Sequence, residues 1–75
     1  MQENDYSREA IGRRLKSGLV DAGISVEELA DRIGRSRFTV SNWIQGKSGI
    51  GLDDAMAICN VLNWPLDRLA RRENA

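Results

Sequence analysis

The sequence SVEELADRIGRSRFTVSNWIQ, residues 25–45, contains two short helical patterns that are separated by a glycine turn. Ser25 is followed three residues later by Glu28, a spacing at which each side chain can accept the other residue's backbone N–H at a helix start. Apolar residues then recur on one face at helical spacing as far as Ile33. Gly34 ends the pattern, because glycine enters the left-handed conformation without a steric penalty. The first pattern therefore predicts an amphipathic helix of about two to three turns.

A second helix is expected directly after the first. Ser36 is a favourable N-cap residue, and Gly46 supplies the stop. The apolar stripe between them consists of Val40, Trp43 and Ile44. The link is too short for the two helices to lie antiparallel, so they must cross closely, and Ala30 is the small side chain that permits this approach. This is the pattern of a helix-turn-helix.

The segments on either side extend the pattern. IGRRLKSGLVDAGIS, residues 11–25, has apolar residues at helical spacing. The helix that this spacing predicts would be capped by Ser7 and would end at Gly23. LDDAMAICNVLNWPLDRLA, residues 52–70, has a helical stripe that ends at Asn63, and a short last helix follows. The expected core positions of these segments are Ile11, Leu15, Leu19, Leu52, Ala55, Ile58, Cys59 and Leu62. Leu66 and Leu69 suit the short last helix.

Residues 11–70 resemble the Cro and repressor-like helix-turn-helix family, typified by the lambdoid phage repressors. IGRRLKSGLVDAGIS is similar to the family's first helix, ELADRIGRSRFTVSNWIQGK to its central pair, and LDDAMAICNVLNWPLDRLA to its fourth and fifth helices. The resemblance implies an all-α fold, a compact five-helix bundle with a central helix-turn-helix, of the lambda-repressor-like DNA-binding kind. The domain is expected to span residues 8–72, with a flexible tail at 1–7 and another at 73–75.

Length and composition set further limits. The chain has 75 residues, of which 41% are hydrophobic and 29% charged, as in one small soluble domain. It has no apolar run of about 18 residues and its N-terminus, MQENDYS, is polar and acidic, so we expect a cytoplasmic protein without a membrane span or signal peptide. The lone Cys59 cannot form an internal disulfide and is expected to be a small buried hydrophobe.

The charge balance argues against a nucleic-acid partner, because 11 basic and 11 acidic residues give a net charge of zero. The distribution of the charges answers part of this objection. Residues 32–52 contain four basic side chains and no acidic one, which predicts a locally positive face on a neutral body. These basic residues are Arg32, Arg35, Arg37 and Lys47. A merely solvated charged face is the alternative interpretation.

The second helix of the motif carries the expected base contacts. Its outer face consists of Arg37, Phe38, Ser41 and Asn42. An arginine can pair with O6 and N7 of guanine, an asparagine with N6 and N7 of adenine, and a phenylalanine can pack on a thymine methyl. The resemblance likewise implies base contacts at Arg37, Phe38 and Asn42. For Phe38, the alternative is an exposed apolar residue without a partner.

Phosphate contacts are expected beside this helix, in the loop that precedes residue 52 and at two helix starts. The predicted contacts are Ser25, Val26, Arg35, Ser36, Lys47 and Ser48. Family members often carry a buried ion pair between Arg and Glu at the positions of Leu19 and Ile44. Because packed apolar groups can replace such a pair without loss of stability, we expect these two side chains to touch.

The resemblance places a pairing surface near the start of the last helix. The interface candidates are Leu66, Arg68 and Trp64. The alternative is that Trp64 and Leu66 close the core instead. A homodimer would present two recognition helices about 34 Å apart, which requires a near-palindromic operator.

Two functions from different classes fit these patterns. The first is a sequence-specific transcriptional regulator, of the phage or bacterial repressor type, on double-stranded DNA in a bacterial or phage-infected cell. The second is a protein-interaction module, antitoxin-like or anti-regulator, that reuses the same scaffold.

Enzyme activity is not expected. The chain has no histidine, one cysteine and no metal-ligand spacing, so no metal site, cofactor or small-molecule ligand is evident. The tripeptide from Gly46 to Ser48 copies the end of a P-loop, but Ser41 stands where the upstream glycine is required.

Overall fold

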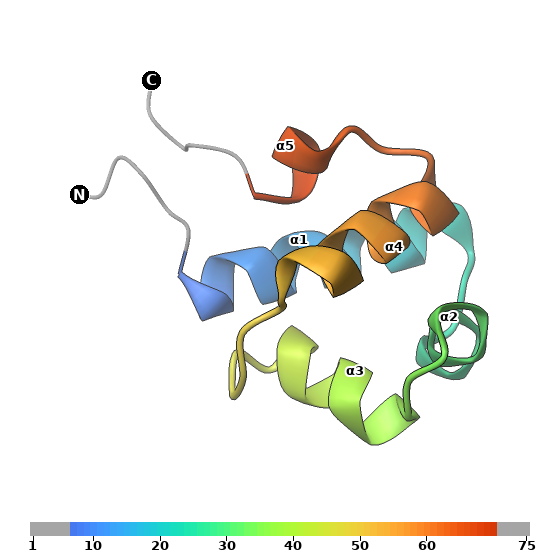
Figure 1. The fold of residues 1–75 in the computed structure, drawn as a ribbon, viewed down its shortest axis with the longest axis horizontal. Coiled ribbons are helices and arrows are strands. Elements are labelled where there is room, and N and C mark those ends of the chain that lie inside the picture. Colours follow the sequence, from blue (N-terminus) through green and yellow to red (C-terminus); the bar gives the residue numbers. More distant parts are fainter. Residues whose placement is uncertain (1–6, 71–75) are drawn as a thin grey trace.

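A computed structural model describes residues 7–70 of the chain and contains five α-helices in that range. The helices are α1 (Arg8–Ala22), α2 (Val26–Ile33), α3 (Arg37–Ile44), α4 (Leu52–Leu62) and α5 (Leu66–Leu69). Figure 1 shows α3 along one edge of the molecule, with α1 and α4 between it and α5. The all-α prediction and its five helices are therefore confirmed. Most of the predicted tails, residues 1–6 and 73–75, lies outside the described range.

Serine caps begin the first three helices, as the sequence predicts. The hydroxyl oxygens of Ser7, Ser25 and Ser36 each accept a backbone N–H from three residues further on. The predicted reciprocal cap at Ser25 forms in one direction, from the Glu28 N–H to the Ser25 hydroxyl oxygen, and the carboxylate of Glu28 accepts a 2.8 Å bond from Arg32 instead. Each such cap stabilises its helix by about 1 kcal/mol, so the helix starts are set locally.

Left-handed residues end the helices where the sequence places them. Gly34 ends α2 at φ 74°, and Asn63 ends α4 at φ 59° as the one described residue other than glycine with a positive φ. Asparagine tolerates this conformation better than most residues because its short side chain can bond locally. The turn between α2 and α3 is consequently short, and α3 must cross α2 at close range.

One hydrophobic core joins all five helices. α3 packs on α2 and α1, α4 packs on α2 and α1, and α5 closes the bundle against α4 and α1. Leu15, Leu29 and Ile58 are completely buried at its centre. Burial of one such side chain contributes roughly 1.5–3 kcal/mol, so these residues dominate the stability of a domain this small.

Two predictions about the core are modified by the structure. Leu52 is expected to face the core, but it is 65% exposed at the first position of α4, which turns its side chain to solvent. Ile11 is half-buried and packs on the edge of the core. Trp43, Ala30 and Cys59 are buried as predicted.

Gly12 is a buried position that the sequence patterns did not single out. A Cβ atom at Gly12 would lie 2.5 Å from the backbone oxygen of Trp43 and 2.6 Å from that of Ile44. The absence of a side chain therefore lets α1 lie directly against the C-terminal end of α3, which fixes where α3 sits on the bundle.

Burial also controls the reactivity of Cys59. The thiol is 4% exposed, and desolvation raises its pKa above the ordinary value for cysteine. Both effects lower the amount of accessible thiolate, which is the reactive species. We expect the native protein at pH 8 to react with a disulfide reagent roughly a hundredfold or more slowly than the urea-unfolded protein. Comparable rates in the two states would contradict this burial.

No helix within residues 7–70 is both long enough and apolar enough to span a bilayer.

Candidate nucleic-acid interface

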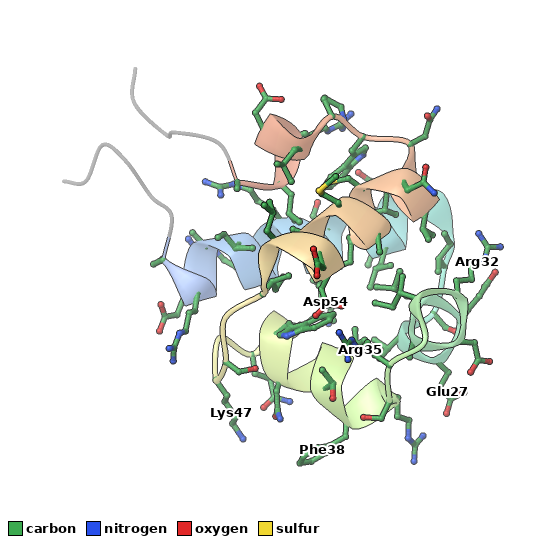
Figure 2. The ribbon with its side chains drawn as sticks, viewed as in Figure 1. Glu27, Arg32, Arg35, Phe38, Lys47 and Asp54 are labelled. Atoms are coloured by element: carbon green, nitrogen blue, oxygen red, sulfur yellow. The ribbon has the colours of Figure 1, made fainter. Side chains whose placement is uncertain are left out.

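The helix α3 turns one face to the core and the other to solvent. Val40 and Trp43 are buried, and Ile44 packs partly buried against the core. On the opposite face the Arg37 and Phe38 side chains are each 72% exposed. Phe38 points away from the body of the molecule (Figure 2). An aromatic ring held outward at the start of a well-capped helix is available to a partner.

The four predicted base-contact residues divide into two pairs. Arg37 and Phe38 are exposed, whereas Ser41 and Asn42 are half-buried one turn further along α3. A shallow hollow on the surface joins three of them to the N-terminus of α2. Its lining residues are Ser25, Val26, Glu27, Arg37, Phe38 and Ser41.

An ion pair crosses this hollow and was not predicted. Nη1 of Arg37 lies 2.6 Å from Oε2 of Glu27, which belongs to the first turn of α2. The two residues are ten positions apart in sequence, so only the crossing of α2 and α3 brings them together. No local pattern could have indicated this contact.

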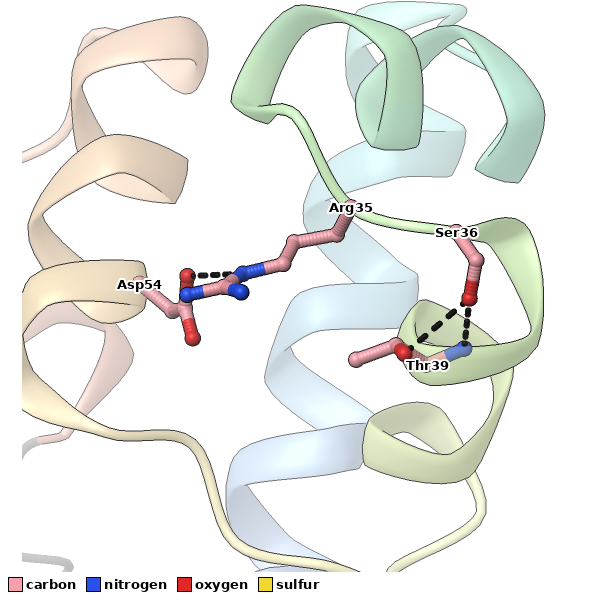
Figure 3. Close-up of polar contacts among 4 residues, drawn as sticks. All are labelled: Arg35, Ser36, Thr39 and Asp54. Atoms are coloured by element: carbon pink, nitrogen blue, oxygen red, sulfur yellow. Dashed lines mark hydrogen bonds and ion pairs between the residues drawn. The ribbon is translucent and has the colours of Figure 1, made fainter.

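The predicted phosphate contacts at the two helix starts lie close to α3. Ser25 and Ser36 are exposed, and their hydroxyl oxygens accept the N–H groups of Glu28 and Thr39. The Ser36 hydroxyl also lies 3.0 Å from that of Thr39 (Figure 3). A capping hydroxyl can still donate its own proton, so these caps do not prevent a phosphate contact.

Arg35 reaches from the turn of the motif toward α4. Its Nε donates a 2.9 Å hydrogen bond to Oδ1 of Asp54, whose side chain is 18% exposed (Figure 3). The contact ties the turn to the first turn of α4. A phosphate contact by Arg35 stays a prediction, and it would have to compete with this carboxylate.

The Arg35–Asp54 tie is expected to stabilise the fold weakly. In a double-mutant cycle of Arg35→Ala and Asp54→Ala, we expect a coupling free energy of at most about 1 kcal/mol, because the arginine is half exposed to water. Urea denaturation of the four proteins measures this coupling. A zero value would show that the ion pair does not hold the turn on α4.

The loop between α3 and α4 carries the remaining predicted phosphate contacts. Gly46 adopts φ 76° just after α3, and the backbone N–H of Lys47 donates a 2.9 Å bond to the backbone carbonyl oxygen of Asn42. This geometry leaves the Lys47 side chain exposed beside α3, on the side of the molecule where Phe38 also projects (Figure 2). Ser48 is half-buried next to the start of α1.

The three dimer candidates differ in their surroundings. Trp64 is half-buried and packs against the core, where its ring faces Gly18 of α1. The guanidinium carbon of Arg68 lies 4.7 Å from the centre of the Trp64 ring, a cation–π distance. Leu66 is 40% exposed. Trp64 thus contributes to the core while Leu66 and Arg68 remain on the surface.

Leu19 and Ile44 belong to the same region of the core, and direct contact between their side chains stays a prediction. Leu19 is buried in the core, and Ile44 packs against that core from α3. Both side chains line one groove between α1, α2 and α3, together with Val20 and Ile24. Apolar packing therefore occupies the region beneath the motif.

Among residues 7–70, no three histidine, cysteine, aspartate or glutamate side chains are grouped to hold a metal ion.

Comparison with solved structures shows the same fold in known regulators. The clp gene regulator ClgR from Corynebacterium glutamicum is 26% identical at a TM-score of 0.80, over 83% of this chain and 66% of that chain. The present sequence thus spans just under two thirds of that regulator's length. The P22 c2 repressor, solved with a synthetic operator, is 20% identical at a TM-score of 0.76, over 81% of this chain and 92% of that chain.

The fold also occurs as a minor part of a longer enzyme chain. HppE, solved with Fe(II) and a substrate, is 23% identical at a TM-score of 0.79, over 85% of this chain but only 37% of that chain. At this identity the likeness concerns the fold alone.

A search of curated proteins found no significant match. Residues 14–73, by contrast, match the family described as the Cro/C1-type HTH DNA-binding domain. The match covers the predicted motif and all of α2, α3, α4 and α5. The expected resemblance is therefore confirmed, and the chain belongs to the Cro/C1-type helix-turn-helix family of DNA-binding domains.

Proposed function

We propose that this chain is a sequence-specific regulator of transcription that inserts α3 into the major groove of double-stranded DNA. The observation that carries the proposal is the outward presentation of Arg37 and Phe38 from a capped helix that is anchored by buried Val40 and Trp43. An α-helix fits the major groove, where each base pair shows a distinct pattern of donors and acceptors. Membership of the family and the likeness to ClgR and to the operator-bound P22 c2 repressor support it. The repressor role and its place on DNA in the bacterial cytoplasm belong to this proposal.

Base reading is assigned to the outer face of α3. Arg37 pairs with a guanine, Phe38 packs on a thymine methyl, and Asn42 with Ser41 reads the next positions. The half-buried positions of Ser41 and Asn42 restrict them to bases that come close to the helix. Arg37 and Phe38 reach further from the surface and are expected to contribute most of the discrimination.

Phosphate contacts flank this face and set its register on the duplex. Lys47 and Ser48 contact one strand from the loop after α3, and Ser25, Val26 and Ser36 offer hydroxyl and N–H groups at two helix starts. Three of the four basic side chains between residues 32 and 52 that were expected to attract DNA, Arg32, Arg35 and Arg37, already pair with carboxylates. Affinity for arbitrary DNA is therefore expected to be modest, because few positive charges remain to displace counterions.

Pairing of two copies would give a homodimer with two recognition helices. Leu66 and Arg68 on the surface of α5, with the exposed edge of Trp64, form the proposed two-fold interface. Recognition helices about 34 Å apart would then read two half-sites of a near-palindromic operator.

Selection of bound sites from a pool of random duplexes tests the proposal. We expect a recurrent half-site that contains guanine, repeated with two-fold symmetry, and a dissociation constant that rises between two salt concentrations in a fluorescence titration. The exposed Phe38 ring and the neutralised arginines also suit a surface that binds protein. Absence of DNA binding even at low salt would reject the regulator and favour that protein-interaction module.

A further inference from the structure

We propose that Glu27 is a positioning residue that presets Arg37 for guanine and thereby raises the sequence discrimination of the site. The inference rests on the proposed DNA-binding function. Its basis is the 2.6 Å contact between Oε2 of Glu27 and Nη1 of Arg37 across the hollow between α2 and α3. Glu27 touches no base in this scheme and acts through the guanidinium.

The contact determines which edge of the guanidinium is offered to DNA. An arginine pairs with guanine O6 and N7 through two parallel N–H groups. Nη1 of Arg37 is directed at Glu27, so the edge that consists of Nε and Nη2 is the one available for that pair. A long, flexible arginine is thus held in one orientation before DNA arrives, and less conformational entropy is lost when the bidentate pair forms.

The carboxylate also weakens binding to sequences that offer no guanine. Glu27 lies in the first turn of α2, where the helix dipole favours a negative charge, but its side chain is 67% exposed on the face that would meet DNA. There it repels phosphates and neutralises Arg37, so attraction to arbitrary DNA falls. The bidentate pair with guanine is kept, because it uses the other edge. The two effects together favour discrimination over affinity.

The hollow places this pair beside a second base-reading group. Phe38 and Ser41 line the same depression as Glu27 and Arg37. A base pair that meets the Arg37 edge would therefore lie next to one that meets the Phe38 ring. The orientation of Arg37 consequently matters for the register of both contacts.

The variant that tests the proposal is Glu27→Gln, and Glu28→Gln is its matched control. Both substitutions remove one negative charge from the first turn of α2, but Glu28 pairs with Arg32 on the same helix and not with α3. Each protein is titrated with two duplexes: the duplex selected by the wild type, and the same duplex with one guanine replaced by adenine. The guanine chosen is the one whose replacement does not change the affinity of Arg37→Ala. The readout is the ratio of the two dissociation constants.

We expect Glu27→Gln to bind both duplexes more tightly but to gain more on the adenine duplex, so that the ratio falls about three- to tenfold. Its dependence on salt should steepen by up to about one unit of slope, because Arg37 becomes free to neutralise a phosphate. Glu28→Gln should leave the ratio unchanged.

Equal ratios in Glu27→Gln, Glu28→Gln and the wild type would overturn the inference, because Glu27 would then act only as a charge. In that case the selected site would still stand and the proposed function would survive. Failure of the wild type to select any sequence would overturn the proposed function and this inference with it.

Discussion

The Gly12→Ala variant is expected to unfold at a temperature roughly 5–20 °C below that of the wild type. The added methyl would lie 2.5 Å from the backbone oxygen of Trp43 and 2.6 Å from that of Ile44. Backbone atoms cannot turn aside as a side chain does, so α1 and α3 must separate along their contact. Overpacking of this kind costs about 1–3 kcal/mol of the free energy of unfolding, and occasionally more. Thermal and urea denaturation followed by circular dichroism measure the loss.

The sign of this effect is diagnostic. In an exposed helix, replacement of glycine by alanine stabilises by up to about 1 kcal/mol, because alanine is the best helix former. A loss of stability at Gly12 therefore reports the close approach of α1 and α3 and not the helix itself. Gly51→Ala is the control, since a Cβ atom there meets nothing within 4 Å, and its stability should change by less than about 1 kcal/mol. Equal or higher stability of Gly12→Ala would contradict the observed packing.

Gly18→Ala separates two kinds of steric conflict within α1. A Cβ atom at Gly18 would lie 2.5 Å from the Trp64 ring, which is a side chain that can move. Its displacement would loosen α5 and the proposed dimer surface without shifting α3. The contrast between the two glycines indicates that α1 positions α3 with its N-terminal half and Trp64, next to the proposed pairing surface, with its C-terminal half.

Helix boundaries were predictable because their signals are local. A serine cap, a left-handed glycine or asparagine and the intervening apolar stripe occupy a few consecutive residues, and the structure confirms them at Ser7, Ser25, Ser36, Gly34 and Asn63. The order of these signals, together with the family resemblance, was sufficient to predict the five-helix arrangement.

Contacts between helices were harder to predict. The approach of Gly12 to α3 and the ion pairs of Arg35 and Arg37 join residues that are 10 to 32 positions apart, and they depend on crossing angles that no local pattern encodes. Leu52 illustrates the same limit. The spacing of apolar residues along a helix is the same whether an apolar residue in the first turn faces the core or faces solvent. The predicted charge pattern consequently overestimated the free positive charge beside α3.

The Arg37→Ala variant is expected to bind the selected operator roughly 5- to 150-fold more weakly than the wild type, which corresponds to about 1–3 kcal/mol for a lost bidentate base contact. The loss should be specific to one base-pair position. When the guanine at that position is replaced, the wild type should lose affinity and the variant should not. Titration of both proteins with both duplexes at one salt concentration measures this coupling.

Arg32→Ala is the matched control for charge. Arg32 is also exposed and also paired with a glutamate, but it lies in the last turn of α2 and its partner Glu28 is on the same helix. Its removal should weaken binding to all duplexes slightly and by the same factor. If Arg32→Ala and Arg37→Ala were equivalent, Arg37 would act only through its charge and base reading would have to lie elsewhere on α3.

Removal of Arg37 also leaves the Glu27 carboxylate without its partner on the face that is proposed to meet DNA. Part of the lost affinity in Arg37→Ala would therefore come from exposed negative charge and not from the missing guanine contact. The double variant Glu27→Gln/Arg37→Ala separates the two terms, because it lacks both groups. Affinity restored on every duplex alike, with no recovery of preference for guanine, would show that the carboxylate sets the strength of binding while the arginine sets its sequence.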